Sequence, residues 1–533
     1  MFRLLLIGLV LFPLGPAYGA QSTERDSLNA LADARGALRS HIRQLRRIRP
    51  SPGTPRIARE ARPKVIRRLD DAGTVIPGNA WIVGHRIGLR VMQGELDQAL
   101  AMAEVCRAEP WWCDALRGFV LHAREEFVEA ESAFDASVDG MPADLHCEWL
   151  EELPRFLLGG ESAREFRRLA CPEQIEEERR VWWLADPLYL IAGNDRKTEH
   201  YARMVAMELH HQWLALEGST CSPAHHEAQV KQGWPDWWWS VERTNRHLGD
   251  GSGYRFIARG LAGLNPLESV PGDWSLDGSS SAEWYDPPYG PIYPLEPQTA
   301  FFRRGDRFLA AVAVDIAGLE LEADAIVDAA LVLTREPDEL HPGVREETSD
   351  GSRYLFEAMV PAEPHVLSIE LLSSEDGAAR GRFAHGLPGE PSEGLDLSDI
   401  LLWDWSEGVN QEVDAVLPRM LGSSHVPADQ EVGVFWELYG AAPGDAIDVS
   451  ISAQPQDRGL LSRVTDLLRI TSPPEGLRLE WSEGMSADEA PARGRTLALN
   501  LSQLRPGRYT LELQVSGESG DPVIRTKEIE LYR

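Results

Sequence analysis

The sequence of 533 residues has few of the features that mark membrane or nucleic-acid-binding proteins. After the first 20 residues no stretch reaches the roughly 18 consecutive apolar residues of a membrane-spanning helix. Positive charge is scarce, since 53 Lys and Arg face 84 Asp and Glu for a net charge of −31. An acidic surface repels nucleic acid phosphates. We therefore expect neither a transmembrane segment in the mature chain nor a nucleic-acid partner.

The sequence also lacks the short motifs that identify common catalytic sites. It contains no Gly-x-Ser-x-Gly turn, no phosphate-binding loop, no Gly-x-Gly-x-x-Gly and no His-Glu-x-x-His. The glycine-rich Asp-Gly-Ser-Gly at 250–253 lacks the later ligands of a calcium loop. We expect no cofactor, although an enzyme without a recognisable motif stays open.

Cysteine is scarce and ends at residue 221. The five cysteines are Cys106, Cys113, Cys147, Cys171 and Cys221. In an oxidising compartment the pairs closest in sequence are expected to bridge, Cys106 with Cys113 and Cys147 with Cys171, which leaves Cys221 over. Other connectivities, and buried free thiols, remain open alternatives.

The N-terminus has the pattern of a secretory signal. Arg3 precedes an apolar run at 4–14, and small residues follow at Ala17, Gly19 and Ala20. The run is too short to span a bilayer, and no cysteine stands at the expected cleavage point. We predict a signal peptide at 1–20 and an exported protein, periplasmic or extracellular.

What is present is enough material for several packed domains. Apolar residues make up 43% of the chain, and it holds 17 tryptophans, which is inconsistent with general disorder. The length is typical of about three or four domains. Charge is uneven, because residues 1–71 contain 14 Lys and Arg against 6 Asp and Glu.

The first half has helical periodicity. The segment 95–110 places Leu96, Ala99, Leu100 and Ala103 on one face and ends at Pro110, and the next unit ends at Pro142. In that second unit Gly118, Ala130, Phe134 and Pro142 have the spacing of a tetratricopeptide repeat. We predict a tetratricopeptide-like helical domain at 25–145, with an ordinary helical bundle as the alternative.

A second helical module is expected at 146–262. Its main element is an amphipathic helix over 194–217, whose buried stripe is expected to contain Tyr201, Met204, Val205, Leu209, Trp213 and Leu216. A Pro- and Gly-rich connector follows at 263–298.

The second half changes to period two. The segments at 306–316, 432–438 and 508–515 alternate apolar and polar residues, as half-buried strands do. We predict two antiparallel, immunoglobulin-like β-sandwiches at 299–405 and 425–533, joined by a linker at 406–424. The predicted fold class is therefore multidomain α then β.

Part of the sequence, about 180–316, resembles the bacterial proteins named for a GWxTD domain. The matching pieces are Asp186-Pro187-Leu188-Tyr189, the segment 194–203 with Glu199-His200, and Gly233-Trp234. After Pro235 this chain has Asp236-Trp237 where the family has Thr-Asp. The resemblance implies an exported bacterial protein and assigns no chemistry.

A tryptophan cluster is the first candidate binding site. Trp234, Trp237, Trp238 and Trp239 stand within six residues, and Arg243, Asn245 and His247 follow. Flat indole rings can stack on sugars, which would make this a glycan site. Consecutive side chains cannot all face one way, however, so a packing core is the alternative that we favour.

A metal site is the second candidate. Glu208 and His211 are three residues apart on the expected helix, and His225 and His226 follow it. No second Glu-x-x-His completes the set, so we expect no metal and keep this group as the alternative.

Together these patterns predict an exported, non-catalytic interaction or scaffold protein of the cell envelope. Its partner would be a protein, bound in a helical groove near Trp81, Arg86 and Arg117. A glycan-binding protein, or a metal-dependent hydrolase centred on 199–247, is the competing hypothesis.

Overall fold

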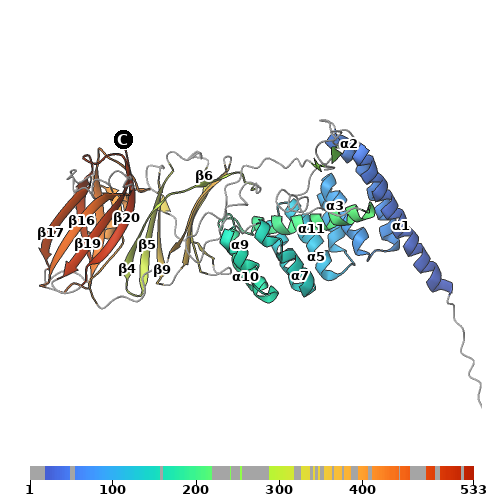
Figure 1. Cartoon of the computed structure of the whole chain (residues 1–533), viewed down its shortest axis with the longest axis horizontal. Coiled ribbons are helices and arrows are strands. Elements are labelled where there is room, and N and C mark those ends of the chain that lie inside the picture. The colour runs from blue at the N-terminus through green and yellow to red at the C-terminus, as the bar shows by residue number, and fades with distance from the viewer. Residues whose placement is uncertain are drawn as a thin grey trace, which may run out of the picture. The chain divides into compact units, whose positions relative to one another are not determined.

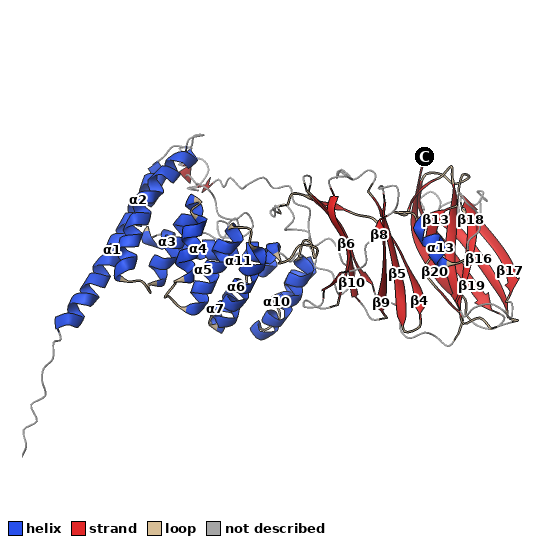
Figure 2. Cartoon of the chain, turned by 180° about the vertical axis from the view of Figure 1, so that it is seen from behind, coloured by secondary structure: helices blue, strands red, loops and turns tan. Residues whose placement is uncertain are grey.

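A computed structural model describes residues 18–47, 54–156, 160–218, 240–241, 253–254 and 287–533. Within the last range it leaves out 288, 317–325, 336–339, 343–345, 348–352, 363–364, 375–376, 386–393, 406–410, 443, 457–475, 486–491 and 518–520. Helices occupy the first half and strands the second, so the α-then-β fold class is confirmed (Figures 1 and 2).

The described residues divide into two compact units. The helical unit contains 18–178 and the described parts of 192–254, and the sheet unit contains 179–191 and 287–533. The segment 179–191 thus belongs to the sheet unit although the helical unit includes the residues on both sides of it. No helix in the described part of the chain is long and apolar enough to span a membrane.

The helical unit is built of helices of very different lengths, and capping residues in the sequence mark the ends of some of them. The Asn79 side chain accepts a hydrogen bond from the Ile82 amide at the start of one helix, and Gly94 ends it with a φ of 84°. The helices are α1 Tyr18–Arg47, α2 Thr54–Val75, α3 Ala80–Gln93, α4 Leu96–Glu104, α5 Pro110–Ala123, α6 Phe127–Gly140, α7 Ala143–Leu150, α8 Leu153–Phe156, α9 Gly160–Phe166, α10 Cys171–Ala185 and α11 Asp195–Leu216.

Helix α11 packs against α3, α5 and α6, and also contacts α1. The approach is close where α3 carries glycine, because a Cβ on Gly84 or Gly88 would lie 2.9 or 2.6 Å from the Leu209 side chain. Gly118 makes the same allowance for the Phe134 ring, 2.9 Å from where its Cβ would stand. The expected stripe of α11 is buried from Tyr201 to Trp213, whereas Leu216, also expected to be buried, is half-buried. This face of α3 and α5 is therefore covered by a helix of the same chain.

Two disulfide bonds lie in the helical unit. They join Cys106 to Cys113 and Cys147 to Cys171, the two pairs proposed from the sequence. Cys221 lies outside the described residues.

The sheet unit contains four main sheets. Two have five strands, in the orders β3-β11-β10-β6-β7 and β14-β20-β19-β16-β17; one has the order β4-β5-β9-β8; in the fourth, β15 pairs with β12, β13 and β18. In chain order, the strands of sheets β3-β11-β10-β6-β7 and β4-β5-β9-β8 are β3 Ile292–Pro294, β4 Gln298–Arg304, β5 Arg307–Asp315, β6 Ile326–Thr334, β7 Leu340–Pro342, β8 Glu346–Glu347, β9 Arg353–Pro361, β10 His365–Ser373 and β11 Ala378–His385. The others are β12 Asp396–Leu397, β13 Leu401–Asp404, β14 His425–Pro427, β15 Glu431–Tyr439, β16 Ala446–Pro455, β17 Leu477–Gly484, β18 Ala492–Asn500, β19 Gly507–Gly517 and β20 Val523–Tyr532.

The sheets form two facing pairs, each closed over an apolar core. The first core includes Val312 of β5 and Ile369 of β10. The second includes Trp436 of β15 and Leu513 of β19. The pairing is not purely antiparallel as expected, because β3 runs parallel to β11 and β14 runs parallel to β20.

The boundary between the two sheet pairs differs from the prediction. Strands β12 and β13, placed in the first sandwich by the boundary at 405, pair instead with β15 of the second. The expected linker contains a short helix, α13 Val413–Val416, and a 3₁₀ turn, η4 Leu417–Arg419. Sequence periodicity marks strands, but it does not show which sheet a strand joins.

A third apolar core connects the two pairs. It contains Phe302 of β4, Trp403 of β13 and Phe435 of β15, together with Val416 and Leu417. Sheets β4-β5-β9-β8 and β12-β15-β13 are consequently covered on both faces. Small residues permit this, since a Cβ on Gly433 would overlap the Trp403 indole.

Candidate functional site

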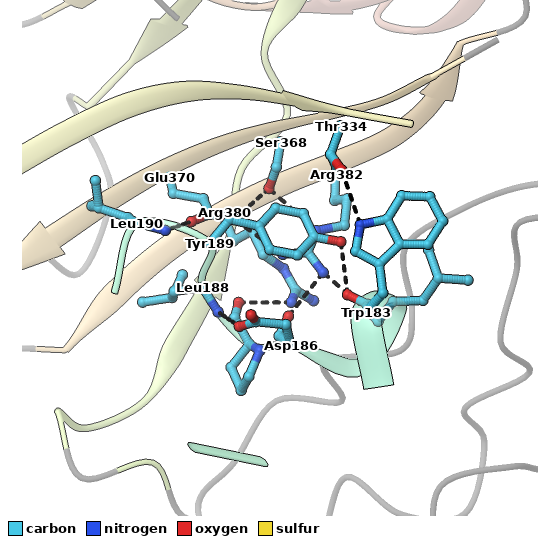
Figure 3. A network of polar contacts seen from close by, with 12 residues as sticks. Trp183, Asp186, Leu188, Tyr189, Leu190, Thr334, Ser368, Glu370, Arg380 and Arg382 are labelled. Atoms are coloured by element: carbon cyan, nitrogen blue, oxygen red, sulfur yellow. Dashed lines mark hydrogen bonds and ion pairs between the residues drawn. The ribbon is translucent and has the colours of Figure 1, made fainter. Parts of the chain in front are cut away.

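A polar network in the sheet unit holds the segment 179–191 on the sheet that contains β11 (Figure 3). The Arg382 guanidinium donates hydrogen bonds to the backbone carbonyls of Leu184, at 3.2 Å, and Asp186, at 2.8 Å. It also pairs with the Glu370 carboxylate at 3.0 Å, and both side chains are fully buried. Ser368 bridges the pair, because its hydroxyl donates to Glu370 at 2.5 Å and accepts from Arg382 at 3.2 Å.

Further contacts hold the same segment in place. Arg380 donates to the Pro187 carbonyl at 2.9 Å, and the Leu190 amide donates to Glu370 at 2.8 Å. The Tyr189 ring covers the Arg382 guanidinium, whose central carbon lies 3.7 Å from the ring centroid. Two side chains complete the network: the Tyr189 hydroxyl donates to the Trp183 carbonyl at 2.9 Å, and the Trp183 indole donates to Thr334 at 3.1 Å (Figure 3).

Burial changes the pKa values of Arg380 and Tyr189 in this network. Burial, with Arg382 beside it, lowers the pKa of Arg380 to about 10, which still leaves the guanidinium charged. Burial raises the pKa of the Tyr189 hydroxyl, so that it stays protonated. A buried Arg–Glu pair whose remaining donors bind main-chain carbonyls can hold a segment in place. Its atoms have no solvent access through which to meet a substrate.

A second polar site lies at the N-terminal half of α11 in the helical unit. His122 of α5 contacts the Glu199 carboxylate through Nε2 at 2.6 Å and the Thr198 hydroxyl through Nδ1 at 3.0 Å. Arg203 pairs with Glu199 from the next turn of α11. Burial alone would raise the pKa of Glu199, but Arg203 and His122 outweigh it and hold that pKa well below the ordinary value.

The carboxylate, imidazole and hydroxyl contact one another in the same order as in a nucleophilic triad. Thr198, however, is fully buried, and its hydroxyl also donates to the Asp195 carbonyl at 3.1 Å. A nucleophile in that position cannot reach a substrate while α11 keeps its place. The arrangement is suited to fixing α11 against α5.

Other ion pairs hold α11 to its remaining neighbours. Lys197 lies between Glu131 at 3.0 Å and Asp135 at 2.7 Å, both on α6. Glu178 accepts a hydrogen bond from Tyr201 of α11 and contacts His146 of α7 at 3.0 Å. Five helices of the unit are thereby linked through α11 and α10.

Asp195, in the first turn of α11, is the exception in this group. Its side chain is buried, and Oδ2 has no hydrogen-bond partner among the described residues. Burial raises the pKa of Asp195 to about 7. A carboxyl that titrates near neutrality is typical of functional sites and of strained buried positions alike.

Most residues of the two sequence-based site hypotheses lie outside the described residues. These are Trp234, Trp237, Trp238, Trp239, Arg243, Asn245, His247, His225 and His226. Two short strands nearby are described, β1 Ser240–Val241 and β2 Gly253–Tyr254, and they pair with each other. Glu208 and His211 are on α11, where Glu208 accepts a hydrogen bond from Gln212 at 2.8 Å. In the described part of the chain no group of three or more His, Cys, Asp or Glu is placed to hold a metal ion.

Of the residues expected near a helical groove, the two on α3 have partners within the helical unit. Trp81 packs edge-on against His85, with ring centroids 4.3 Å apart, and Arg86 pairs with Asp70 of α2 at 2.9 Å. Arg117 of α5 is exposed. The face that α3 and α5 offer to a ligand is occupied by α11.

The network around Arg380 and Arg382 was not predicted from the sequence, although the sequence contains a pattern that indicates it. Arg380 and Arg382 are two residues apart and therefore share one face of a strand. Glu370 interrupts the apolar segment 365–373. Charged residues at positions where a strand faces a neighbouring segment indicate buried pairs, but only the fold brings 184–190 to them.

No protein-family model matches the chain, and no curated protein sequence matches it. Among solved structures, three are similar over part of the chain: the adhesin InvE of Yersinia pseudotuberculosis, red sea bream transglutaminase, and CfaE, the adhesive subunit of CFA/I fimbria of enterotoxigenic Escherichia coli. The first is 9% identical, covers 45% of this chain and 56% of its own, and has a TM-score of 0.14. The second is 9% identical, covers 58% and 42%, and has a TM-score of 0.14. The third is 8% identical, covers 47% and 82%, and has a TM-score of 0.13. At such TM-scores these similarities carry no argument about fold or function.

Proposed function

We propose that the chain is an exported, non-catalytic interaction protein of the bacterial envelope. The helical unit would bind a partner protein, and the sheet unit would act as a stiff spacer. The observation that carries the proposal is the use of the buried charges. Arg382, Arg380 and Glu370 all bind main-chain groups of segment 179–191, as a structural role requires.

The matching pieces of the GWxTD resemblance acquire a structural task in this proposal. Asp186 to Tyr189 is the stretch that the buried arginines of β11 hold. The segment 194–203 is the part of α11 that carries the ion pairs to α5 and α6. Both motifs would then serve to attach neighbouring parts of the chain, one to the sheet unit and one to the helical unit, and neither would take part in a reaction.

We further propose that both sheet pairs are immunoglobulin-like and that α3 to α6 are two tetratricopeptide-like repeats. The sheet orders β3-β11-β10-β6-β7 and β14-β20-β19-β16-β17 correspond strand for strand, which favours one ancestral topology for the two pairs. For the helices, the close contact of Gly118 with Phe134 supports the repeat.

Because α11 fills the usual ligand-binding face, a partner would contact the opposite side of the helical hairpins. Exposed residues of the hairpins include Arg117 on α5, and Val128 on α6 is 50% exposed. A photocrosslinking amino acid at position 117 should capture a partner in intact envelopes. The matched control is the same amino acid at Arg478 of β17, which is also exposed, in the spacer. Equal capture at both positions, or at neither, would contradict the assignment of binding to the helical unit.

Export and the alternative functions have separate tests. Fractionation should find the protein outside the cytoplasm, lacking residues 1–20, with both disulfides formed. The glycan or hydrolase alternative requires saturable sugar binding that is lost in Trp238→Ala and Trp239→Ala without loss of folding, or stoichiometric zinc in the purified protein. Either result would replace the interaction proposal.

A further inference from the structure

A groove of about 410 Å³ lies between α1 and α2 of the helical unit, apart from both sites described above. This volume falls within the usual range for small-molecule sites. Small residues open it, among them Gly36, Ala37 and Ala61. A Cβ added to Gly36 would meet no heavy atom within 4 Å, so the space beside α1 at this point is free.

His41 lines this groove, and in the part of the chain that the structure describes its imidazole has a nitrogen without a hydrogen-bond partner. The side chain is 3% exposed, and Nε2 has no hydrogen-bond partner among the described residues. Burial, with Arg62 nearby, lowers the pKa of His41 to about 4, so the imidazole is neutral at physiological pH. A neutral imidazole offers one donor and one acceptor. A buried polar atom without a partner is uncommon in proteins and calls for a ligand or water that completes it.

Two cations of α2 line the same groove. Lys64 and Arg68 are one helical turn apart, and neither forms an ion pair within the part of the chain that the structure describes. Neighbouring arginines differ, because Arg43 pairs with Glu217 at 3.3 Å and Arg90 pairs with Asp70 at 2.7 Å. The groove lining includes a single acid, Asp33. The positive balance of 1–71 further concentrates anions around this hairpin.

We propose that the groove binds a small phosphate-bearing ligand, with Lys64 and Arg68 contacting the phosphate and His41 donating a hydrogen bond to it. A phosphate monoester carries up to two charges and several acceptor oxygens, which suit two adjacent cations and a neutral N–H donor. A lipid headgroup and a soluble phosphate ester share this chemistry. The proposal does not depend on the scaffold function, since it concerns a different pair of helices.

Calorimetric titration of the purified full-length protein with glycerol 3-phosphate tests the proposal. We expect saturable binding that glycerol, the neutral counterpart, does not show. Co-sedimentation with vesicles that contain phosphatidic acid, whose headgroup is a phosphate monoester, compared with phosphatidylcholine vesicles, distinguishes the source: preference for the phosphatidic acid vesicles assigns a headgroup, and binding of the soluble ester alone assigns a soluble metabolite. Absence of saturable binding in both arms overturns the proposal.

Matched variants separate site binding from general electrostatics. Lys64→Gln with Arg68→Gln removes two charge-assisted contacts and should weaken binding at least about tenfold. Arg167→Gln with Arg168→Gln removes the same charge from exposed positions after α9 and should leave binding unchanged. Equal loss in the two double variants would reduce the effect to net charge and refute the site.

A second pair of variants tests the space itself. Gly36→Glu places a carboxylate in the open volume and should abolish binding, whereas Gly36→Ala leaves the groove open and should preserve it. Thermal unfolding of both variants checks that α1 remains folded. In addition, the imidazole carbon resonance of His41, identified by its absence in His41→Gln, should shift on saturation with glycerol 3-phosphate. A resonance that does not move would exclude His41 from the site.

Discussion

The two units solve the problem of buried charge in different ways. In the sheet unit, the Arg382–Glu370 pair is fully buried and its donors and acceptors are shared with main-chain groups. In the helical unit, ion pairs such as His122 with Glu199 retain some solvent exposure, and Asp195 is buried without a partner for Oδ2. The helical unit also carries both disulfides, whereas the sequence beyond residue 221 contains no cysteine.

This contrast indicates which changes should lower the stability of each unit. The sheet unit depends on three large apolar cores and on ion pairs such as Arg382 with Glu370 and Arg304 with Glu437, so we expect its stability to respond to mutation and little to redox state. The helical unit has smaller cores around α1, α2 and α11 and is closed by covalent bonds. Its stability should respond to reductant and to pH.

Breaking the buried pair should have the largest effect. Arg382→Met leaves Glu370 as an uncompensated buried charge, and the free energy of unfolding of the sheet unit should fall by about 3–5 kcal/mol. Chemical denaturation followed by tryptophan fluorescence measures it. The matched control is Arg478→Met, which removes an exposed pair with Glu480 and should cost less than about 1 kcal/mol. Similar losses in both variants would show that the network is not the anchor of segment 179–191.

The disulfides give the next largest effect, confined to the helical unit. Replacing Cys147 and Cys171 by serine frees a loop with a sequence separation of 24 and should cost about 3.5 kcal/mol by loop-closure entropy. The bond between Cys106 and Cys113, with a separation of 7, should contribute about 2.5 kcal/mol. Denaturation with and without reductant checks both values. A reductant-dependent loss of stability in the sheet unit would break the comparison.

Asp195 should make the helical unit pH-dependent. Because burial raises its folded-state pKa to about 7 from 3.8, the folded unit binds the more protons between these values. This carboxyl therefore favours folding fully below about pH 4, and that contribution is lost as pH rises through about 7. At pH 8 Asp195→Asn should stabilise the unit by on the order of 1–3 kcal/mol, with no gain at pH 4. Unfolding curves at the two pH values measure the difference; an equal effect at both would show that Asp195 does not titrate in this range.

The smallest effect concerns the contact between α3 and α11. In Gly88→Ala the new Cβ would lie 2.6 Å from Leu209, so overpacking should offset the helix-propensity gain and leave a net loss of about 0–2 kcal/mol. Gly36→Ala is the control, because its Cβ has free space and it should stabilise α1 by about 0.5–1 kcal/mol. If the Gly88 variant were as stabilising as the control, α11 would not cover this face in solution.

Local patterns were sufficient for much of the fold. The stripe from Tyr201 to Trp213 predicted the buried face of α11, since helical periodicity depends on neighbouring residues alone. Alternation in 508–515 predicted β19, in which Tyr509, Leu511, Leu513 and Val515 are buried. Both patterns involve only residues of the element itself, so they can be recognised without knowledge of the fold.

Contacts between residues far apart in the chain could not be predicted from the sequence. The membership of β12 and β13 in the second sheet pair depends on partners 28 to 43 residues away in β15. Arg382 meets Leu184 and Asp186 across almost 200 residues. No periodicity records such contacts, and the candidate groove likewise depends on how α1 meets α2. The tryptophan cluster, which the sequence made most conspicuous, lies outside the described residues.

The discontinuous make-up of the sheet unit limits how the protein can be dissected. A fragment beginning at residue 287 would retain Arg380, Arg382 and Glu370. It would lack the thirteen-residue segment 179–191, whose main-chain groups form hydrogen bonds with these side chains. Such a fragment should be a poor stand-alone expression target. A synthetic peptide of 179–191 supplied in trans should rescue it, as in split-protein complementation.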